Sequence, residues 1–415
     1  MNIHRVVVTG LGAVSPCGHD VPTSWDNIVH GRSGVAPITL FATDDMNVKI
    51  AAEVKDWDPT RYMEARDARR RDRCVQFAVV AAREAVRQAG LIVNEGNTYD
   101  IGVFVGTAVG GLNSYYDVCS THLQHGARRA SPLTIPLIVG DSASSHVALE
   151  LGARGPNMAP VSACSSGADA IGLAYRTILC GDALAMLAGG AEATIAPIGI
   201  AAFDALRAMS RRNDDPTGAS RPFAADRDGL VMGEGAAIVV LERLDWALAR
   251  GAQPLAEVIG YGRTDDAFHI TAPAPDGAGA ILAMKRALQD ARLSPDEIDY
   301  INAHGTATLL NDPIETAAMK AVLGQRACRV PISATKSTTG HMMGATGALE
   351  AILCVLALRE GILPPTINLH APDPVCDLDH VPHVARRQSI RTAMSNSFGF
   401  GGHNTVLILK SSFFM

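Results

Sequence analysis

The chain has 415 residues, 47% of them hydrophobic, and a formal net charge of −6 from 36 Lys and Arg against 42 Asp and Glu. This acidic balance argues against nucleic-acid binding, and the length predicts two or three domain-sized units. The eight Cys form no CxxC pair or Cys/His metal pattern, which favours a reducing, cytoplasmic compartment without disulfides. A strand pattern starts at VVVTG without a signal segment, and the most apolar stretch, 183–203, carries Glu192, so we expect no membrane span.

In chain order, strand patterns alternate with helix patterns, and four elements of the first half recur in the second. An amphipathic helix leads into a buried strand ending in Gly-Thr, then a Pro-x-Ser-Ala segment follows, and finally a Gly-rich turn feeds a long strand. The matching segments are 82–108 with 285–307, PVSACSSGADAI (160–171) with PISATKSTTG (331–340), and 232–243 with 398–409. The repeated order predicts an α/β protein with two similar halves, 1–250 and 251–415.

The first half has a longer gap between its Gly-Thr strand and its Pro-x-Ser-Ala segment. We therefore expect residues 113–145 to form an insertion, either over the functional site or at an oligomer contact. A helix rich in small residues follows each Pro-x-Ser-Ala segment, with Gly167, Ala168, Ala170, Gly172 and Ala174 in one and Gly344, Ala345, Gly347 and Ala348 in the other. Gly in a helix costs up to about 1 kcal/mol relative to Ala, so we expect two central helices whose backbones approach closely between sheets.

Cys164 lies where a β-type run meets the start of the first small-residue helix, in PVSACSSGADAIG (160–172). The N-terminus of a helix stabilises a thiolate, which favours a nucleophile at this position. Free Cys is also among the most buried residue types, so a small core residue is the alternative.

Polar residues follow predicted strands of the second half, in NAHGTAT, ATKSTTGHMMGATGALE and NSFGFGGHN (396–404). These segments contribute His304, Lys336 and His341, and the last one is a Gly-rich loop that can aim backbone N–H groups at an oxyanion. A zinc site is the alternative, but it needs three or four ligands with short spacing. His304 and His341 lie far apart in the sequence, and no third ligand is evident.

Together, these motifs resemble those of the elongating, class II β-ketoacyl-[acyl-carrier-protein] synthases of the thiolase-like superfamily. The resemblance extends from VVVTGLGAVSPCG near the start of the sequence to SNSFGFGGHNTVLIL near its end. The resemblance implies a thiolase-like fold, with duplicated βαβαβαββ halves in α-β-α-β-α layers around two central helices, and a homodimer. It also implies a Cys-His-His triad. Initiating synthases carry Cys-His-Asn instead, and thiolases carry Cys-His-Cys.

The activity implied by this resemblance is a decarboxylating Claisen condensation of an acyl chain with malonyl-acyl-carrier-protein, which gives 3-oxoacyl-carrier-protein in fatty acid elongation. Cys164 would carry the acyl chain, His304 and His341 would stabilise the malonyl enolate, and the backbone N–H groups of Cys164 and Phe400 would hold the second oxyanion. No cofactor and no metal are expected beyond the phosphopantetheine that carries the substrates. A ketosynthase of a specialised polyketide or polyene pathway, a degradative thiolase and a non-catalytic chain-length subunit are the alternatives.

The resemblance assigns further roles. Lys336 is expected to pair with Glu315, which orders the site and tunes His341, and direct proton transfer by Lys336 is the alternative. Phe400 is expected to act as a gate, although Phe398 and Phe400 could also be core aromatic residues. The predicted substrate-binding residues are Val109, Ala163, Phe203 and Met343 at the acyl chain, Thr306 and Thr308 at the pantetheine amide, and Phe398. The segment EARDARRRDR (64–73) is predicted to be a helix, either a solvated face or a dock for an acidic acyl carrier protein. The predicted docking residues are Arg66, Arg69, Arg70 and Arg207.

Overall fold

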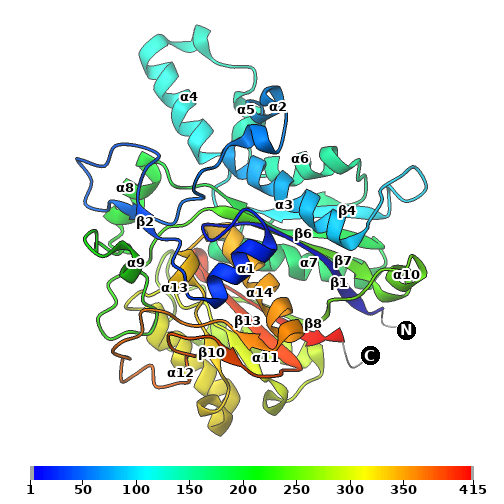
Figure 1. The fold of residues 1–415 in the computed structure, drawn as a ribbon, viewed down its shortest axis with the longest axis vertical. Coiled ribbons are helices and arrows are strands. Elements are labelled where there is room, and N and C mark those ends of the chain that lie inside the picture. The colour runs from blue at the N-terminus through cyan, green and yellow to red at the C-terminus, as the bar shows by residue number, and fades with distance from the viewer. Residues whose placement is uncertain (1–3, 413–415) are drawn as a thin grey trace.

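A large β-sheet forms the centre of the molecule in the computed structural model, which describes residues 4–412. Within those residues the sheet has ten strands, in the order β10-β9-β13-β14-β8-β1-β7-β6-β4-β5 (Figure 1). The strands are β1 (Val6–Val14), β4 (Ile101–Gly106), β5 (Asn157–Met158), β6 (Ala185–Glu192), β7 (Gly235–Arg243), β8 (Ala256–Asp265), β9 (Tyr300–Asn302), β10 (Ile332–Ser333), β13 (Thr392–Gly399) and β14 (His403–Ser411). Two short ladders lie apart from it, β2 (Ala36–Pro37) with β3 (Ile50–Ala51) and β11 (Ile362–Leu363) with β12 (Arg386–Arg387).

The strand order is symmetric about the junction between β8 and β1. On one side β4 runs parallel to β5 and β6, while β7 is antiparallel to both β6 and β1. On the other side β9 runs parallel to β10 and β13, while β14 is antiparallel to both β13 and β8. Five strands from the start of the chain thus mirror five from its end. A duplicated unit would give this order, and the boundary between the halves near residue 250 stays a prediction.

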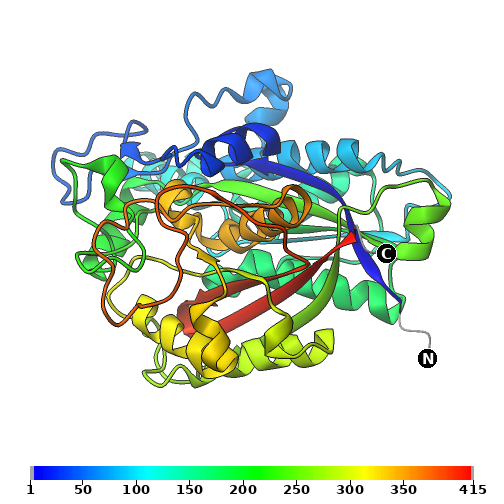
Figure 2. The ribbon, with the colours of Figure 1, turned by 60° about the horizontal axis from the view of Figure 1, so that its bottom comes forward.

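Two helices, α7 (Ser166–Cys180) and α14 (Thr346–Glu360), lie between the two sides of the sheet, as Figure 2 shows for the orange α14. The outer faces are covered by α3 (Arg73–Ala89) and α6 (Ser142–Leu151) on one side and by α11 (Ala278–Ala291) and α12 (Asn311–Leu323) on the other. The remaining α-helices are α1 (Val21–Val29), α2 (Ala65–Ala68), α4 (Leu112–His125), α5 (Thr134–Ile138), α8 (Pro197–Ala205), α9 (Pro216–Ala219), α10 (Leu244–Ala249) and α13 (Lys336–Thr339). This layered α/β arrangement confirms the predicted thiolase-like fold.

Small residues let the central helices approach each other. A Cβ added to Gly167 would lie 2.8 Å from the carbonyl oxygen of Gly344, and one added to Gly347 would lie 2.9 Å from the Cβ of Ala168. Both distances are below ordinary van der Waals contact, so larger side chains would force the helices apart. The close approach brings the N-terminal ends of α7 and α14 together.

The predicted helix 64–73 is wrong as a single element. Helix α2 covers only Ala65–Ala68, and α3 starts anew at Arg73. The side chain of Asp72 accepts a hydrogen bond from Cys74 N at 3.0 Å and so caps α3. This N-cap fixes a new helix start and ends the earlier turn.

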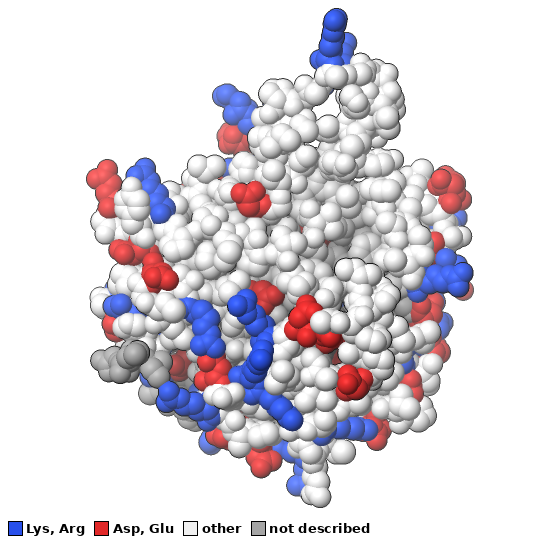
Figure 3. All heavy atoms as spheres, turned by 180° about the vertical axis from the view of Figure 1, so that it is seen from behind, with Lys and Arg blue, Asp and Glu red and all other residues white. Residues whose placement is uncertain are grey.

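The insertion forms α4, a short turn (Ala127–Arg129) and α5. It projects from the body of the protein at the top of Figure 1, and α4 has no buried residue. Figure 3 shows Lys and Arg side chains at the tip of this projection, where Arg128 and Arg129 are exposed. Among residues 4–412, no helix is both long and apolar enough to cross a membrane.

Candidate active site

A pocket of about 350 Å³ opens where the N-terminal ends of the central helices meet the loops of both halves. Ten of the residues predicted from the sequence line it, namely Cys164, Phe203, Arg207, His304, Thr306, Thr308, His341, Met343, Phe398 and Phe400. They come from segments spread across the chain. The fold therefore gathers most of the predicted site into one cavity.

Cys164 lies in a tight turn, Ala163–Ser165, immediately before α7. The strand before it is β5, which ends at Met158, so residues 160–162 are irregular and Ala163 has a φ of +50°. Burial raises the pKa of the Cys164 thiol to about 11, although Lys336 and the backbone N–H of Phe400 act to lower the pKa. Desolvation thus outweighs the thiolate stabilisation that the helix N-terminus predicts.

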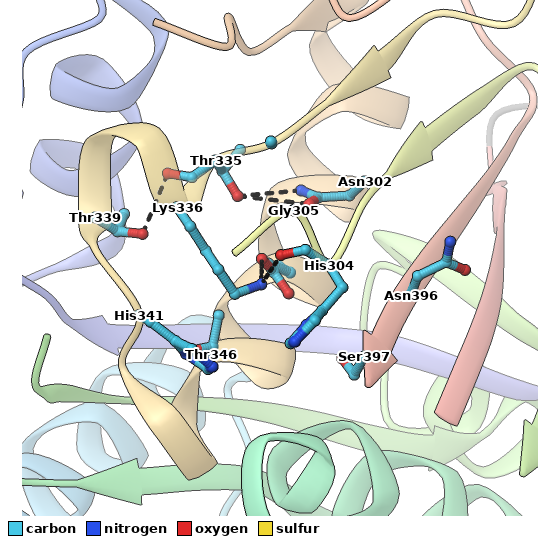
Figure 4. Close-up of polar contacts among 12 residues, drawn as sticks. Asn302, His304, Gly305, Thr335, Lys336, Thr339, His341, Thr346, Asn396 and Ser397 are labelled. Carbon is cyan, nitrogen blue, oxygen red and sulfur yellow. Dashed lines mark hydrogen bonds and ion pairs between the residues drawn. The ribbon is translucent and has the colours of Figure 1, made fainter. Parts of the chain in front are cut away.

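His304 and His341 lie side by side, with ring centroids 5.5 Å apart and ring planes at 85°. Both are almost fully buried, and desolvation, together with the nearby Lys336, lowers the pKa of each imidazole well below its usual value. Both rings are therefore neutral near pH 7. The close-up in Figure 4 shows them on segments that converge from different parts of the second half.

The tautomer of His341 follows from its neighbours. Its Nδ1 accepts a hydrogen bond from Met343 N at 3.2 Å and lies 3.1 Å from the hydroxyl of Thr346. Since Nδ1 is an acceptor in a neutral ring, the proton is on Nε2. This Nε2 is buried and has no hydrogen-bond partner among the described residues, and the same holds for Nδ1 of His304. Unpartnered buried polar atoms at a pocket are suited to a substrate.

Lys336 pairs with Glu350, and the predicted pairing with Glu315 is wrong. The Lys336 Nζ lies 2.6 Å from Glu350 Oε1 and donates to the carbonyl oxygen of His304 at 2.5 Å (Figure 4). The Glu315 carboxylate instead accepts the backbone N–H groups of His304 and Gly305, each at 2.8 Å. Glu315 thus positions the His304 turn through its backbone.

Sequence reasoning missed Glu350. The residue lies within α14, a helix that is otherwise apolar and buried over most of its length. A charged residue in such a helix requires a buried partner, and Lys336 in the preceding segment was the available cation. A buried acid within an apolar helix, together with a buried Lys shortly before it, is the sequence signal from which the pair could have been predicted.

Aromatic residues form one wall of the pocket. The rings of Phe203 and Phe400 stack with centroids 6.2 Å apart, and Phe398 lies 5.8 Å from His304. Phe400 starts a turn, Phe400–Gly402, in which Gly401 and Gly402 have φ values of +83° and +84°. These values require Gly, and they let the turn bring its backbone close to Cys164.

Some predicted residues lie outside the pocket lining. Val109 is 46% exposed, and Ala163 turns the backbone beside the thiol without lining the cavity. Lys336 and Glu315 are buried behind the two imidazoles. The predicted docking residues Arg66, Arg69 and Arg70 are exposed in or beside α2, away from the pocket lining, whereas Arg207 lies in it.

The fold and the pocket define a ketosynthase-type acyltransferase of the thiolase-like class. Residues 4–247 match the model of the beta-ketoacyl synthase N-terminal domain, and residues 255–370 match that of the C-terminal domain. The chain belongs to the β-ketoacyl synthase family, which confirms the resemblance.

Similar proteins support this assignment. The chain is 49% identical to the 3-oxoacyl-[acyl-carrier-protein] synthase 2 of Synechocystis sp. and 47% identical to that of Staphylococcus aureus, each over 406 residues and 98% of both chains. Among solved structures, the ishigamide ketosynthase/chain length factor matches with a TM-score of 0.92 and 38% identity, over 98% of this chain and 99% of the other. A type II PKS acyl-carrier protein in complex with its ketosynthase matches with a TM-score of 0.92 and 33% identity, over 99% and 100%.

Proposed function

We propose that this protein condenses an acyl chain carried on Cys164 with malonyl-acyl-carrier-protein, with loss of CO₂, to give 3-oxoacyl-carrier-protein in fatty acid elongation. The observation that carries the proposal is the meeting of Cys164 with two neutral imidazoles, His304 and His341, in one pocket. The chain is 47–49% identical to 3-oxoacyl-[acyl-carrier-protein] synthase 2 proteins and 33% identical to the type II PKS ketosynthase, which favours elongation over a specialised pathway.

The first step is acyl transfer to Cys164. The sulfur attacks the thioester carbonyl of acyl-carrier-protein, the carrier sulfur leaves, and the proton lost by the Cys164 thiol ends on the carrier thiol. The backbone N–H groups of Cys164 and Phe400 both lie close enough to act on the thiol. Donors in that position stabilise the negative oxygen that forms when the carbonyl is attacked.

The second step is decarboxylation of the malonyl group. The bond to the carboxylate breaks, CO₂ leaves, and the electron pair moves into an enolate. The unpartnered Nε2–H of His341 and the neighbouring ring of His304 supply neutral donors for the enolate oxygen. The enolate carbon then attacks the acyl carbonyl, the new carbon–carbon bond forms, and the Cys164 thiolate is released.

The substrates are positioned by the remaining pocket residues. We assign Phe203 and Met343, with Val109 and Ala163 beside them, to the acyl chain, and Phe400 to a gate that separates the thiol from the pocket mouth. Thr306 and Thr308, whose hydroxyl oxygens lie 3.0 Å apart, are placed to contact the pantetheine amide, with Phe398 next to them. Lys336 and Glu315 act on His304 from behind. The proposed chemistry uses no metal or further cofactor.

We assign carrier docking to three exposed Arg of the 64–73 segment and to Arg207. Arg71 pairs with Glu150 and Arg73 pairs with Glu234, so these two support the fold. Arg66, Arg69 and Arg70 are exposed and form no ion pair within the described part of the chain. Free surface Arg attract an acidic carrier and raise its association rate.

The insertion supports a homodimer. Helix α4 buries none of its residues in the isolated chain, and apolar side chains of the insertion are exposed, among them Tyr115, Leu123 and Ile135. Large exposed apolar patches are typical of protein–protein contacts.

The proposal is tested by incubating the enzyme with acyl-carrier-protein and malonyl-carrier-protein and following both the product and the acyl-enzyme by mass spectrometry. We expect an acyl adduct on Cys164, and we expect Cys164→Ala to abolish condensation. Cys180→Ala is the matched control, because Cys180 ends the same helix but is exposed. An adduct confined to another Cys would contradict the proposal.

A further inference from the structure

Glu192 is a buried carboxylate that no ion pair neutralises. It ends β6, its side chain is fully buried, and no cation lies within salt-bridge distance in the described part of the chain. Its oxygens accept the backbone N–H groups of Ala108 at 2.6 Å, Val109 at 3.3 Å, Gly110 at 3.1 Å and Gly344 at 3.2 Å. These backbone N–H groups replace water as hydrogen-bond donors to the carboxylate, and such hydrogen bonds favour its ionised form.

The four N–H groups belong to two segments that are distant in sequence. Residues 108–110 follow β4 in the first half, whereas Gly344 belongs to the turn Met343–Ala345 before α14. A Cβ on Gly344 would lie 2.5 Å from Ala108 N and 2.8 Å from Glu192 Oε2. Glycine at this position therefore lets both segments close on the same carboxylate.

These segments contribute side chains to the apolar cluster that contains the reacting Cys164. Met343 lines the pocket, and Ala108, Met343, Phe203 and Cys164 belong to one apolar cluster. The Met343 N–H also donates to His341 Nδ1. A shift of the segment 108–110 against the 343–345 turn would therefore change the walls of the cavity that begins at Cys164.

We propose that Glu192 is a positioning residue for acyl transfer, which fixes the segment 108–110 against the 343–345 turn and so sets the chain length that the acyl pocket accepts. The inference rests on the proposed function and adds a specificity determinant to it. A glutamine amide has the same shape as the carboxylate, but its NH₂ group would face peptide N–H groups instead of accepting from them. Glu192→Gln therefore opens the contact with little change in volume.

The pKa of Glu192 is raised by burial to about 7, against the lowering effect of the four backbone N–H groups. Its negative charge also acts to raise the pKa of Cys164.

The test compares Glu192→Gln with the parent over acyl-carrier-proteins of graded length, by kcat/KM and by mass spectrometry of acyl-Cys164. We expect the parent's preferred chain to lose up to about 100-fold in kcat/KM, since small misplacements at a reacting centre have effects of this size. Poorer chain lengths should lose less, so that the length preference flattens. Glu84→Gln is the matched control, because the Glu84 carboxylate accepts the N–H groups of Ala13 and Val21 outside the pocket.

Malonyl decarboxylation, measured in a Cys164→Gln background, separates positioning from general damage. We expect Glu192→Gln to affect this step less than acyl transfer, because Thr346 in α14 also contacts His341 Nδ1, at 3.1 Å, and helps to hold the ring when the 343–345 turn shifts. An equal loss at every chain length and in decarboxylation, or a profile like that of Glu84→Gln, would overturn the proposal. If the Gln variant does not fold, the same comparison is made with Glu192→Asp, which keeps the carboxylate but has a shorter side chain. If the parent itself forms no acyl-Cys164, the proposed function fails before any variant is compared.

Discussion

Replacing Lys336 by Met keeps the length of the side chain but removes the charge that neutralises Glu350. Both side chains are 1% exposed, and the Nζ and Oε1 atoms are 2.6 Å apart. Removing one partner of a buried pair costs about 3–5 kcal/mol, because the other charge is left uncompensated. Burial raises the pKa of Glu350 to about 7 even with Lys336 present. At a pH high enough to keep Glu350 ionised, we therefore expect Lys336→Met to lower the free energy of unfolding by about 3–5 kcal/mol. The loss should shrink as the pH falls and Glu350 takes up a proton.

The assay is equilibrium unfolding in urea, with a double mutant that removes both charges. Lys336→Met combined with Glu350→Gln should recover part of the loss, with a coupling energy of about 0.5–3 kcal/mol. Lys320→Met is the control. Its exposed partner Asp377 forms a surface pair, which is worth at most about 1 kcal/mol.

The same variant changes the two imidazoles. The positive charge of Lys336 contributes, after burial, to the lowered pKa of His304 and of His341. Its removal should let both rings take up a proton at higher pH than in the parent, as followed by NMR. Recovery of stability by Glu315→Gln instead of Glu350→Gln, or unchanged imidazole titration, would refute the assignment of the pair.

Three further results are expected. In a Cys164→Gln background, His304→Ala or His341→Ala should each lower malonyl decarboxylation by about 10²–10³, as for other oxyanion donors, and full release of CO₂ without both rings would exclude this role. Charge reversal at Arg69 and Arg70 should raise the KM for carrier-bound substrate, with the effect shrinking as salt rises. Arg329→Glu should leave the KM unchanged, because Arg329 is an exposed Arg of the second half that does not line the pocket. In the free enzyme, alkylation of Cys164 by iodoacetamide should be slow near pH 7 and rise as the pH approaches the thiol pKa of about 11, because only the thiolate reacts; a plateau already reached at pH 8 would contradict the burial effect.

The sequence alone predicted the site residues that lie at the ends of helices and strands. Cys164, His304 and His341 each follow a recognisable boundary, and the duplicated order of elements predicted that these boundaries would meet. Small residues such as Gly167 and Gly347 indicated the close helix pair, because their cost in a helix needs a packing reason. These predictions depend on local residue patterns and on an internal repeat, and both can be recognised in a single sequence.

Two sequence predictions, the partner of Lys336 and the single helix 64–73, were wrong because each depends on which of several groups forms a contact in the folded protein. Glu315 and Glu350 are both acids near Lys336 in the fold, and only the structure shows that backbone N–H groups already occupy Glu315. The break before Arg73 depends on one side-chain cap at Asp72, within a segment whose composition suits a continuous helix.

The pKa of Cys164 also depends on the folded environment, which the sequence does not show, and it bears on how reactive the thiol is. A helix N-terminus favours a thiolate, but a helix end packed between the two sides of the sheet also excludes water, and the second effect is the larger one for this thiol. The resting enzyme therefore holds a protonated, weakly reactive Cys164. In the mechanism proposed above, the backbone N–H of Phe400 and the two imidazoles stabilise negative charge at the substrate oxygens, and therefore more there than at the sulfur itself. Under the proposed function, such a site reacts with a bound thioester but only slowly with reagents that need a free thiolate.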